Sequence, residues 1–289
     1  MAVQRRQQPR GLILDAKGMV DDAQENIWVD RLTRIGYFAR GIIYGLIGLF
    51  ALQLAVGLGG KITDQSGALS SLAGQPFGKI LLIVVAVGMI GLFIWGIIRA
   101  VADPLRKGND FKGLVSRAGY LISGLSYGAL FIPTLNLIQG SGHRSAGSTA
   151  TAQKAAAGVL AMPGGPLIVG VVGAALIGVG IYRIYAGYSS KLNERLKSYK
   201  MSAQQRRLAN RLGRFGYIAI GIVFIILGFL AILAAATLDP RKVGGFDQAL
   251  TFLVRQSYGP FLLLIVALGL IAYAIYSFMG SLWFRIKEL

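Results

Sequence analysis

Long apolar runs separated by short polar connections dominate the chain. Six runs of roughly 20 residues or more carry few or no charges, at about 35–57, 77–101, 118–138, 164–187, 215–237 and 259–284. A run of about 20 apolar residues spans the hydrocarbon core of a bilayer as a helix. The runs lack the alternation of β-barrel strands, and a helix satisfies its own backbone groups in lipid. The pattern therefore predicts an all-α polytopic membrane protein with six transmembrane helices.

A short motif opens every second run. Arg34-Ile35-Gly36-Tyr37 returns as Arg117-Ala118-Gly119-Tyr120 and again as Arg214-Phe215-Gly216-Tyr217. Seven residues after each arginine comes another glycine, namely Gly41, Gly124 and Gly221. Ten residues after each arginine comes an aromatic residue, namely Tyr44, Tyr127 and Phe224. Such regular spacing indicates a repeated structural unit.

The intervening runs repeat as well. Each begins at a glycine, namely Gly78, Gly165 and Gly259. Ten residues further on lie the small residues Gly88, Ala175 and Gly269, and seventeen residues on lie the aromatic residues Trp95, Tyr182 and Tyr276. The repeat is thus a pair of helices present in three copies. We predict three tandem two-helix units in a pseudo-threefold arrangement about an axis along the membrane normal.

The connections predict the remaining organisation. We expect a basic cytoplasmic tail over 1–33 and a basic interfacial linker helix over 188–213. The three repeats are expected over 34–101, 102–187 and 214–289. Ser202 with Gln205 is a capping box that favours a helix in the linker. Inside the units, short surface helices are expected over 68–73, 152–162 and 248–255. Asp64 precedes the first of them, and Asp247 is expected to cap the last.

Charge and composition refine this interpretation. Charged residues make up 15% of the chain, the formal net charge is +18, and there is no cysteine, which excludes disulfides and thiolate chemistry. The bias of Lys and Arg among the connections predicts that both termini are cytoplasmic. The basic balance indicates attraction to anionic lipid headgroups. Contact between nucleic acid and the basic 188–214 segment is a weaker alternative, and no nucleic-acid partner is expected.

No constellation of residues suggests catalysis. No Asp or Glu lies within a predicted span, which argues against a proton- or cation-coupled pump. His143 is the single histidine and lies in a Gly- and Ser-rich loop, so neither a metal cluster nor a histidine-based triad can form. The sequence predicts a protein that is not an enzyme and has no cofactor and no metal.

The motif residues are the candidates for binding. At about 100° per residue, the arginine, the tyrosine, the later glycine and the later aromatic share one helix face. In one interpretation the arginines reach the headgroups and the tyrosines anchor at the interface. In the other, three arginines form a ring that binds a phosphate, a carboxylate or an acidic lipid headgroup. The candidate residues are Arg34, Tyr37, Arg40, Arg117, Tyr120, Arg214 and Tyr217.

The depth of the other arginines distinguishes them. Arg40 lies about 9 Å along the helix from Arg34, which makes it the deepest charge of the first span. An ionisable residue inside a membrane indicates a functional site. The corresponding positions are Ser123 and Ile220, so no ring is expected at this level. Arg99 and Arg183 lie near the cytoplasmic ends of their spans and are expected to reach the headgroups.

Glycines predict where helices pack closely. Gly41 with Gly45 and Gly124 with Gly128 are GxxxG pairs, which allow helix backbones to approach each other. Gly221 is expected to act in the same way in the third unit. The motif glycines, Gly36, Gly119 and Gly216, point nearly the opposite way. Each first helix of a unit should therefore have two close-packing faces.

These repeats resemble a bacterial membrane family known as domain of unknown function 1206. Arg34, Gly36, Tyr37, Gly41 and Tyr44 carry the resemblance best, and it covers roughly 34–280. The family unit is a pair of helices, commonly in three tandem copies. The resemblance implies this fold and a bacterial inner (plasma) or thylakoid membrane, and it implies no established activity.

Two functions remain open at this point. The first is a non-enzymatic scaffold that binds membrane lipids, anionic ones above all, or a membrane-protein partner. The alternative is a carrier or channel for a small anion through the threefold centre. Arginines that converge on a polar axis would favour the carrier, whereas arginines that reach outward from an axis packed with small and apolar residues would favour the scaffold.

Overall fold

The structure is a computed structural model that describes residues 27–101, 103, 108, 110–140, 147–189 and 201–283. Its six long helices are α2 (Ile27–Ala55), α4 (Gly78–Val101), α5 (Phe111–Ile138), α7 (Gly165–Tyr188), α8 (Ala203–Thr237) and α10 (Gly259–Trp283). Short helices connect them, namely α3 (Gln65–Ala73), α6 (Ser148–Leu160), α9 (Phe246–Val254) and the 3₁₀ turn η3 (Pro240–Lys242). The tail up to residue 26, His143 and linker residues 190–200 lie outside the described residues.

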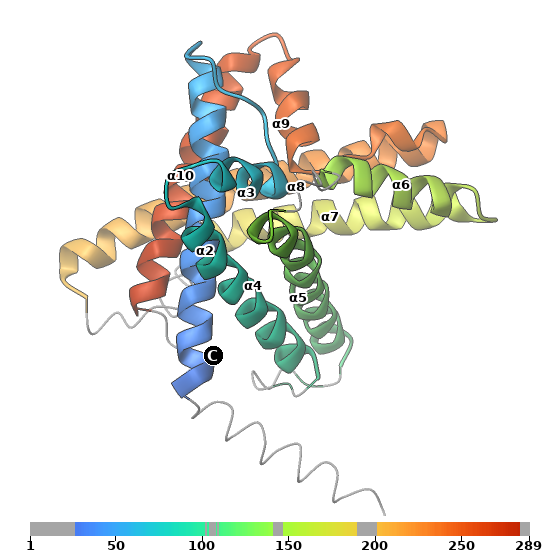
Figure 1. Cartoon of the computed structure of the whole chain (residues 1–289). Coiled ribbons are helices and arrows are strands. Elements are labelled where there is room, and N and C mark those ends of the chain that lie inside the picture. Colours follow the sequence, from blue (N-terminus) through green and yellow to red (C-terminus); the bar gives the residue numbers. More distant parts are fainter. Residues whose placement is uncertain are drawn as a thin grey trace, which may run out of the picture.

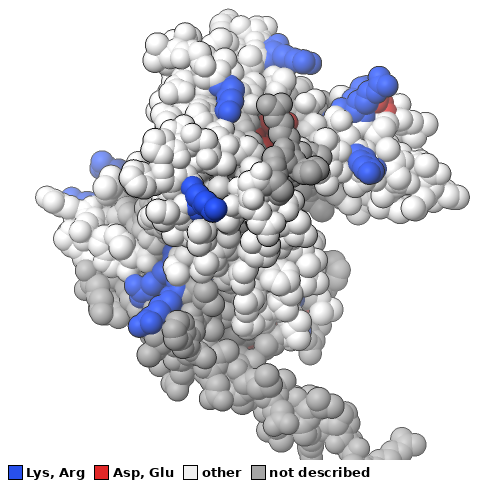
Figure 2. All heavy atoms as spheres, viewed as in Figure 1, with Lys and Arg blue, Asp and Glu red and all other residues white. Residues whose placement is uncertain are grey.

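The six long helices confirm the predicted multi-pass membrane protein. Each is long and apolar enough to cross a bilayer, and no strand occurs in the described part of the chain. We call the end where α2, α5 and α8 begin and α4, α7 and α10 end the terminal face. The opposite end, with the short helices, is the loop face. The surface in Figure 2 is mostly uncharged, with scattered Lys and Arg, as expected for helices that face lipid.

The helices form a ring in which each unit packs against the next one. Helix α4 packs along α5, α7 along α8, and α10 along α2, so the second helix of every unit packs against the first helix of the following one. These three pairs lie side by side in Figure 1 and run in three different directions. This cyclic order confirms the predicted pseudo-threefold arrangement.

The glycines seven residues after each motif arginine lie in these three interfaces. A Cβ on Gly41 would lie 2.6 Å from the Phe278 ring of α10, and one on Gly124 would lie 3.1 Å from the Gly96 Cα of α4. A Cβ on Gly221 would lie 2.7 Å from the Gly180 carbonyl of α7. Small residues at these positions allow the backbones to approach, as in other membrane helix pairs.

The two remaining GxxxG glycines lie in the same interfaces. A Cβ on Gly45 would meet Ala274 of α10 at 3.6 Å, and one on Gly128 would meet the Phe93 ring of α4 at 2.9 Å. All the glycines proposed for helix packing therefore lie against a neighbouring helix.

Packing within the units differs from one unit to another. Helix α2 packs against α4, and α8 packs against α10, which makes units one and three compact hairpins. In the described residues α5 and α7 make no comparable contact, so the second unit is open. In keeping with this, only 11% of the α5 span and 17% of the α7 span is buried, against 39–56% for the others.

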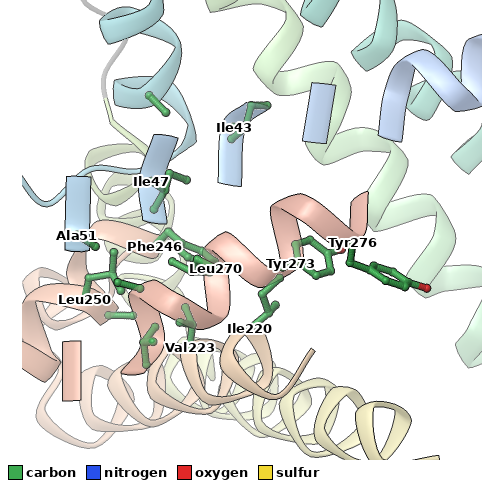
Figure 3. Close-up of a cluster of buried hydrophobic side chains, with 14 of the residues drawn as sticks. Ile43, Ile47, Ala51, Ile220, Val223, Phe246, Leu250, Leu270, Tyr273 and Tyr276 are labelled. Carbon is green, nitrogen blue, oxygen red and sulfur yellow. The ribbon is translucent and has the colours of Figure 1, made fainter. Parts of the chain in front are cut away.

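The core lies between α2, α8, α10 and the short helix α9. Ile47, Leu250 and Leu270 are fully buried there, and Figure 3 shows side chains of α2, α8 and α10 converging. Helix α9 contributes Phe246 and Leu250 from the loop face. Apolar packing thus ties the third unit to the first.

A polar network joins the three units at the loop face. Asp64 caps α3 by accepting a hydrogen bond from the Gly67 amide at 2.7 Å, and its other oxygen accepts one from the Ser148 amide. The Thr149 hydroxyl donates to Asp247 at 2.6 Å and accepts from the Gly245 amide. The N-termini of α3, α6 and α9 therefore meet at one place.

The predicted capping role of Asp247 is wrong. Gly245 is the N-cap of α9, and Asp247 lies in its first turn, where it accepts the hydrogen bond from the second unit instead. A carboxylate near a helix N-terminus is favourable at either position. The local sequence therefore does not indicate whether Asp247 caps its own helix or accepts a hydrogen bond from another unit.

The predicted linker helix does not end at residue 213, and its residues 190–200 lie outside the described part of the chain. The capping box at Ser202 and Gln205 is present, with both reciprocal hydrogen bonds, and it starts a helix at Ala203. That helix continues without interruption into the third unit as α8. No proline follows to end it, and Gly213 and Gly216 are tolerated within it because both pack against α10.

Glycine is required where each second helix begins. A Cβ on Gly78 would collide with the Leu72 carbonyl oxygen, and one on Gly259 would collide with the Val254 carbonyl oxygen. A Cβ on Gly165 would likewise collide with the Val159 carbonyl oxygen. The repeated glycines therefore allow each short helix to fold directly back onto the start of its transmembrane helix.

Candidate functional site

The three motif arginines lie at three different helix ends. Arg34 donates to the Leu282 carbonyl of α10 at 3.0 Å, and Arg117 donates to the Ala100 and Val101 carbonyls of α4 at 2.7 and 3.0 Å. The Arg214 guanidinium lies 5.7 Å from the centre of the Tyr188 ring at the end of α7. Each arginine thus contacts the last turn of the helix that belongs to the preceding unit in the ring.

These contacts account for the repeated motif. The last carbonyls of a helix lack partners within the helix, and a cation there also complements the helix dipole. Two of the three arginines satisfy such carbonyls directly. The structure assigns Arg34, Arg117 and Arg214 to joining neighbouring units, and it does not bring their side chains together around the axis.

Arg40 lies in an aromatic environment near the axis. Its guanidinium is 5.1 Å from the centre of the Tyr37 ring and 5.5 Å from that of Tyr127 on α5. Its Nη1 donates to the Tyr273 hydroxyl of α10 at 3.4 Å. A cation over an aromatic face gains about 0.5–2 kcal/mol, which makes this a favourable position for a guanidinium.

A second arginine joins the same group from the opposite side of the ring. Arg183 of α7 lies 4.9 Å from the centre of the Phe224 ring of α8. It also approaches the Tyr273 hydroxyl and the Tyr44 side chain, which interact with Arg40 as well. Tyr44 packs edge-on against Tyr273, with ring centres 5.1 Å apart. We call Arg40, Arg183 and these tyrosines the axial cluster.

The axial cluster lies where the three units meet. Its aromatic walls include the aromatic residue found ten positions after the arginine in each unit, namely Tyr44, Tyr127 and Phe224. Equivalent positions of three repeats converge only near the axis that relates them. The cluster therefore marks the pseudo-threefold axis, within the transmembrane part of the protein.

The two axial guanidiniums have no carboxylate partner among the described residues. The Nε atoms of Arg40 and Arg183 are buried, and no described residue forms a hydrogen bond with them. No Asp or Glu occurs in any of the six spans. A single arginine at the centre of a membrane helix costs about 2.5–3.5 kcal/mol on insertion scales, and the cost falls when the charge is compensated. The arrangement therefore favours binding of an anion.

The predicted tyrosines divide between two places. Tyr37 contacts Arg40, and Tyr217 packs edge-on against Tyr273 at 5.6 Å, so both border the axial cluster. Tyr120 instead lies 5.4 Å from the guanidinium of Arg99, at the end of α4. Of the candidate residues, the structure groups Arg40, Tyr37 and Tyr217 and places the others at the helix ends.

Sequence reasoning missed Arg183 and Tyr273. Arg183 is expected to reach the headgroups, but its side chain turns inward to Phe224. The other two units have different residue types at the positions equivalent to Arg183 and Tyr273, so the sequence repeats do not point to either residue. Their depth inside an apolar run was the only signal that could have found them.

The cluster offers binding chemistry. Planar guanidiniums bind phosphate and carboxylate through paired hydrogen bonds, and tyrosine hydroxyls can add further ones. Among the described residues there is no group of His, Cys, Asp and Glu that could hold a metal ion. No nucleophile paired with a base occurs in the cluster.

Comparison with known proteins agrees with the repeat structure. The profile of the family described as Domain of Unknown Function (DUF1206) matches the chain three times, over 35–103, 118–190 and 215–283. An uncharacterized protein of Bacillus subtilis (strain 168), YxxB, is 36% identical over 256 residues, which cover 89% of this chain and 91% of that protein. No solved structure matches the chain.

Proposed function

We propose that this chain, which belongs to the Domain of Unknown Function (DUF1206) family, is a non-enzymatic membrane protein that binds an anionic lipid. The observation that carries the proposal is the pair of axial arginines, Arg40 and Arg183, whose buried Nε atoms lack partners. A phosphate-type headgroup would satisfy both guanidiniums at once. No protein carboxylate in the spans competes for them.

The terminal face supports the same proposal. Arg99 lies in the last turn of α4, and Arg117 and Arg214 lie against the last turns of α4 and α7 on this face, where headgroups would surround them. An excess of basic residues marks the cytoplasmic side of bacterial membrane proteins. We therefore place the terminal face, and both chain ends, on the cytoplasmic side of a bacterial inner (plasma) or thylakoid membrane.

The alternative is a carrier or channel for a small anion. The position of the axial cluster on the pseudo-threefold axis favours it, because a central anion site is what such a carrier requires. The loop face opposes it, because the network of Asp64, Ser148, Thr149 and Asp247 places two carboxylates where the three units meet at that face. These charges would repel a departing anion, so we favour the lipid-binding protein.

Lipid retained on purified protein tests the proposal. The full chain, extracted from membranes that contain phosphatidylglycerol, is analysed by native mass spectrometry. The double variant Arg40→Gln/Arg183→Gln should retain at least about tenfold less phosphatidylglycerol, because each charge-assisted hydrogen bond contributes about 1.5–3 kcal/mol. The matched control is Lys79→Gln/Lys154→Gln, which also removes two charges, from exposed positions on α4 and α6, and leaves the axis intact.

The outcomes separate the functions. Retention equal to wild type in the axial variant, with its thermal midpoint unchanged, would show that the axial arginines do not hold lipid. Uptake of phosphate or sulfate by proteoliposomes, above that of protein-free liposomes and dependent on Arg40, would instead establish the carrier.

A further inference from the structure

The second unit keeps the residues of a closed hairpin although its helices lie apart. In the first unit a Cβ on Gly36 of α2 would lie 2.5 Å from Leu92 of α4 and 3.1 Å from the Gly88 carbonyl. In the third unit a Cβ on Gly216 of α8 would lie 2.6 Å from the Tyr273 Cα of α10. A Cβ on the equivalent glycine, Gly119 of α5, would have no atom of the described residues within 4 Å.

The second helix of that unit shows the same difference. Trp95 of α4 and Tyr276 of α10 are 5% and 3% exposed, whereas the equivalent Tyr182 of α7 is 61% exposed. Gly88 and Gly269 are buried in their hairpins, whereas the equivalent Ala175 is exposed. The faces of α5 and α7 that would close the unit are therefore small enough to pack together and stand uncovered here.

The uncovered faces lead to the axial cluster. At about 100° per residue, Val172 and Val179 lie within about 40° of Arg183 on α7. These valines are 52% and 41% exposed. On α5, the exposed Ser123 lies within about 40° of Tyr127, which contacts Arg40. An apolar face and a face with a hydroxyl thus flank the approach to the two guanidiniums.

We infer that α5 and α7 form a lateral entrance through which a phospholipid reaches the axial arginines from the bilayer. This inference rests on the proposed lipid-binding function and names the route and the ligand class. The anionic phosphate lies on Arg40 and Arg183, and the acyl chains lie between α5 and α7 against the exposed valines. The entrance closes when Gly119 packs against Ala175, as Gly36 packs against α4 in the first unit.

The geometry selects a lipid over a dissolved anion. At the loop face the polar network joins the N-termini of α3, α6 and α9, and its two carboxylates, Asp64 and Asp247, would repel an anion that approaches from this side. The open side of the ring faces the bilayer, because both α5 and α7 are transmembrane helices with apolar exposed residues. A phosphate attached to acyl chains suits that side, whereas free phosphate would need to cross lipid.

A disulfide that holds the entrance shut tests this route. The protein contains no cysteine, so Gly119→Cys/Ala175→Cys introduces a single pair at exposed positions. The full chain in lipid-free detergent micelles is oxidised, and phosphatidylglycerol is then added and counted by native mass spectrometry. Oxidised protein should bind at least about tenfold less phosphatidylglycerol than the same protein after reduction. The single variants Gly119→Cys and Ala175→Cys should bind equally well in both states.

Reversing the order of steps provides the complementary result. Protein that is loaded with phosphatidylglycerol and then oxidised should keep its lipid during washing, because the exit is closed. Two cysteines that both react with a maleimide but never join would overturn closure. Full lipid binding by the oxidised pair would overturn the lateral route while leaving the axial arginine site in place, since that site is judged by the Arg40→Gln/Arg183→Gln variant. Binding of inorganic phosphate, unaffected by oxidation, would identify a dissolved anion as the ligand.

Discussion

Replacing Gly180 by leucine should separate α7 from α8 and destabilise the folded protein strongly. A Cβ at this position would lie 2.6 Å from the Gly221 carbonyl and 2.7 Å from Ile225, and the rest of a leucine side chain has no space. Overpacking of this kind costs about 1–3 kcal/mol or more. We expect a thermal midpoint lower by about 10 °C, together with a sharp loss of monodisperse protein.

The same helix supplies the control. Gly178 lies two residues away and has nothing within 4 Å, so Gly178→Leu adds the same side chain on an exposed face. Its thermal midpoint should stay within about 2 °C of wild type. Since α7 lacks close packing against α5 in the described residues, α8 is its main support. If the two variants were equally stable, the glycine contacts would not hold this pair together.

Replacing Gly259 by alanine should destabilise the third unit strongly. The added Cβ would collide with the Val254 carbonyl oxygen, which is backbone and cannot move without shifting α9 from the start of α10. Helix α9 supplies Phe246 and Leu250 to the core, so the shift would reach Ile47 on α2. We expect a loss of about 2–3 kcal/mol, measured as unfolding in a detergent titration.

A glycine-to-alanine change at Gly158 in the second unit should not lower the stability of the protein. Gly158 lies in α6 with nothing within 4 Å, and alanine is favoured over glycine in a helix by about 0.5–1 kcal/mol. Gly158→Ala should therefore leave stability equal or slightly higher. A loss of equal size in both variants would mean that glycine flexibility, and not the close approach of the backbone, matters at these positions.

The repeated features were predictable because each serves a contact that recurs in every unit. The helices follow from apolar length, and Gly41, Gly124 and Gly221 follow from the need for close helix approach. The three tandem units follow from their spacing, and the family profile matches them at the same places. Local composition and periodicity carry this information.

The partners that these residues contact in the neighbouring units were not predictable. The partner of Arg117 is a backbone carbonyl of α4, and every residue type offers a carbonyl, so no pattern identifies it. The open second unit is even less visible, because Gly119 and Ala175 match the closed units in size. Only the arrangement of the whole ring decides whether they touch.

The axial cluster was predictable in part. The depth of Arg40 in its span indicates a functional site. Arg183 and Tyr273 come from other units at positions without counterparts, and they lie near Arg40 only because the ring brings the three units together. A site whose residues are not repeated in every unit can be located only from the three-dimensional structure.

An experimental structure in nanodiscs that contain phosphatidylglycerol tests the central claim most directly. We expect phosphate density between Arg40 and Arg183, with guanidinium nitrogens about 2.7–2.9 Å from its oxygens. Acyl-chain density should continue from it between α5 and α7. Guanidiniums of Arg40 and Arg183 extended to the headgroup region, with the space between them filled by apolar side chains, would contradict it.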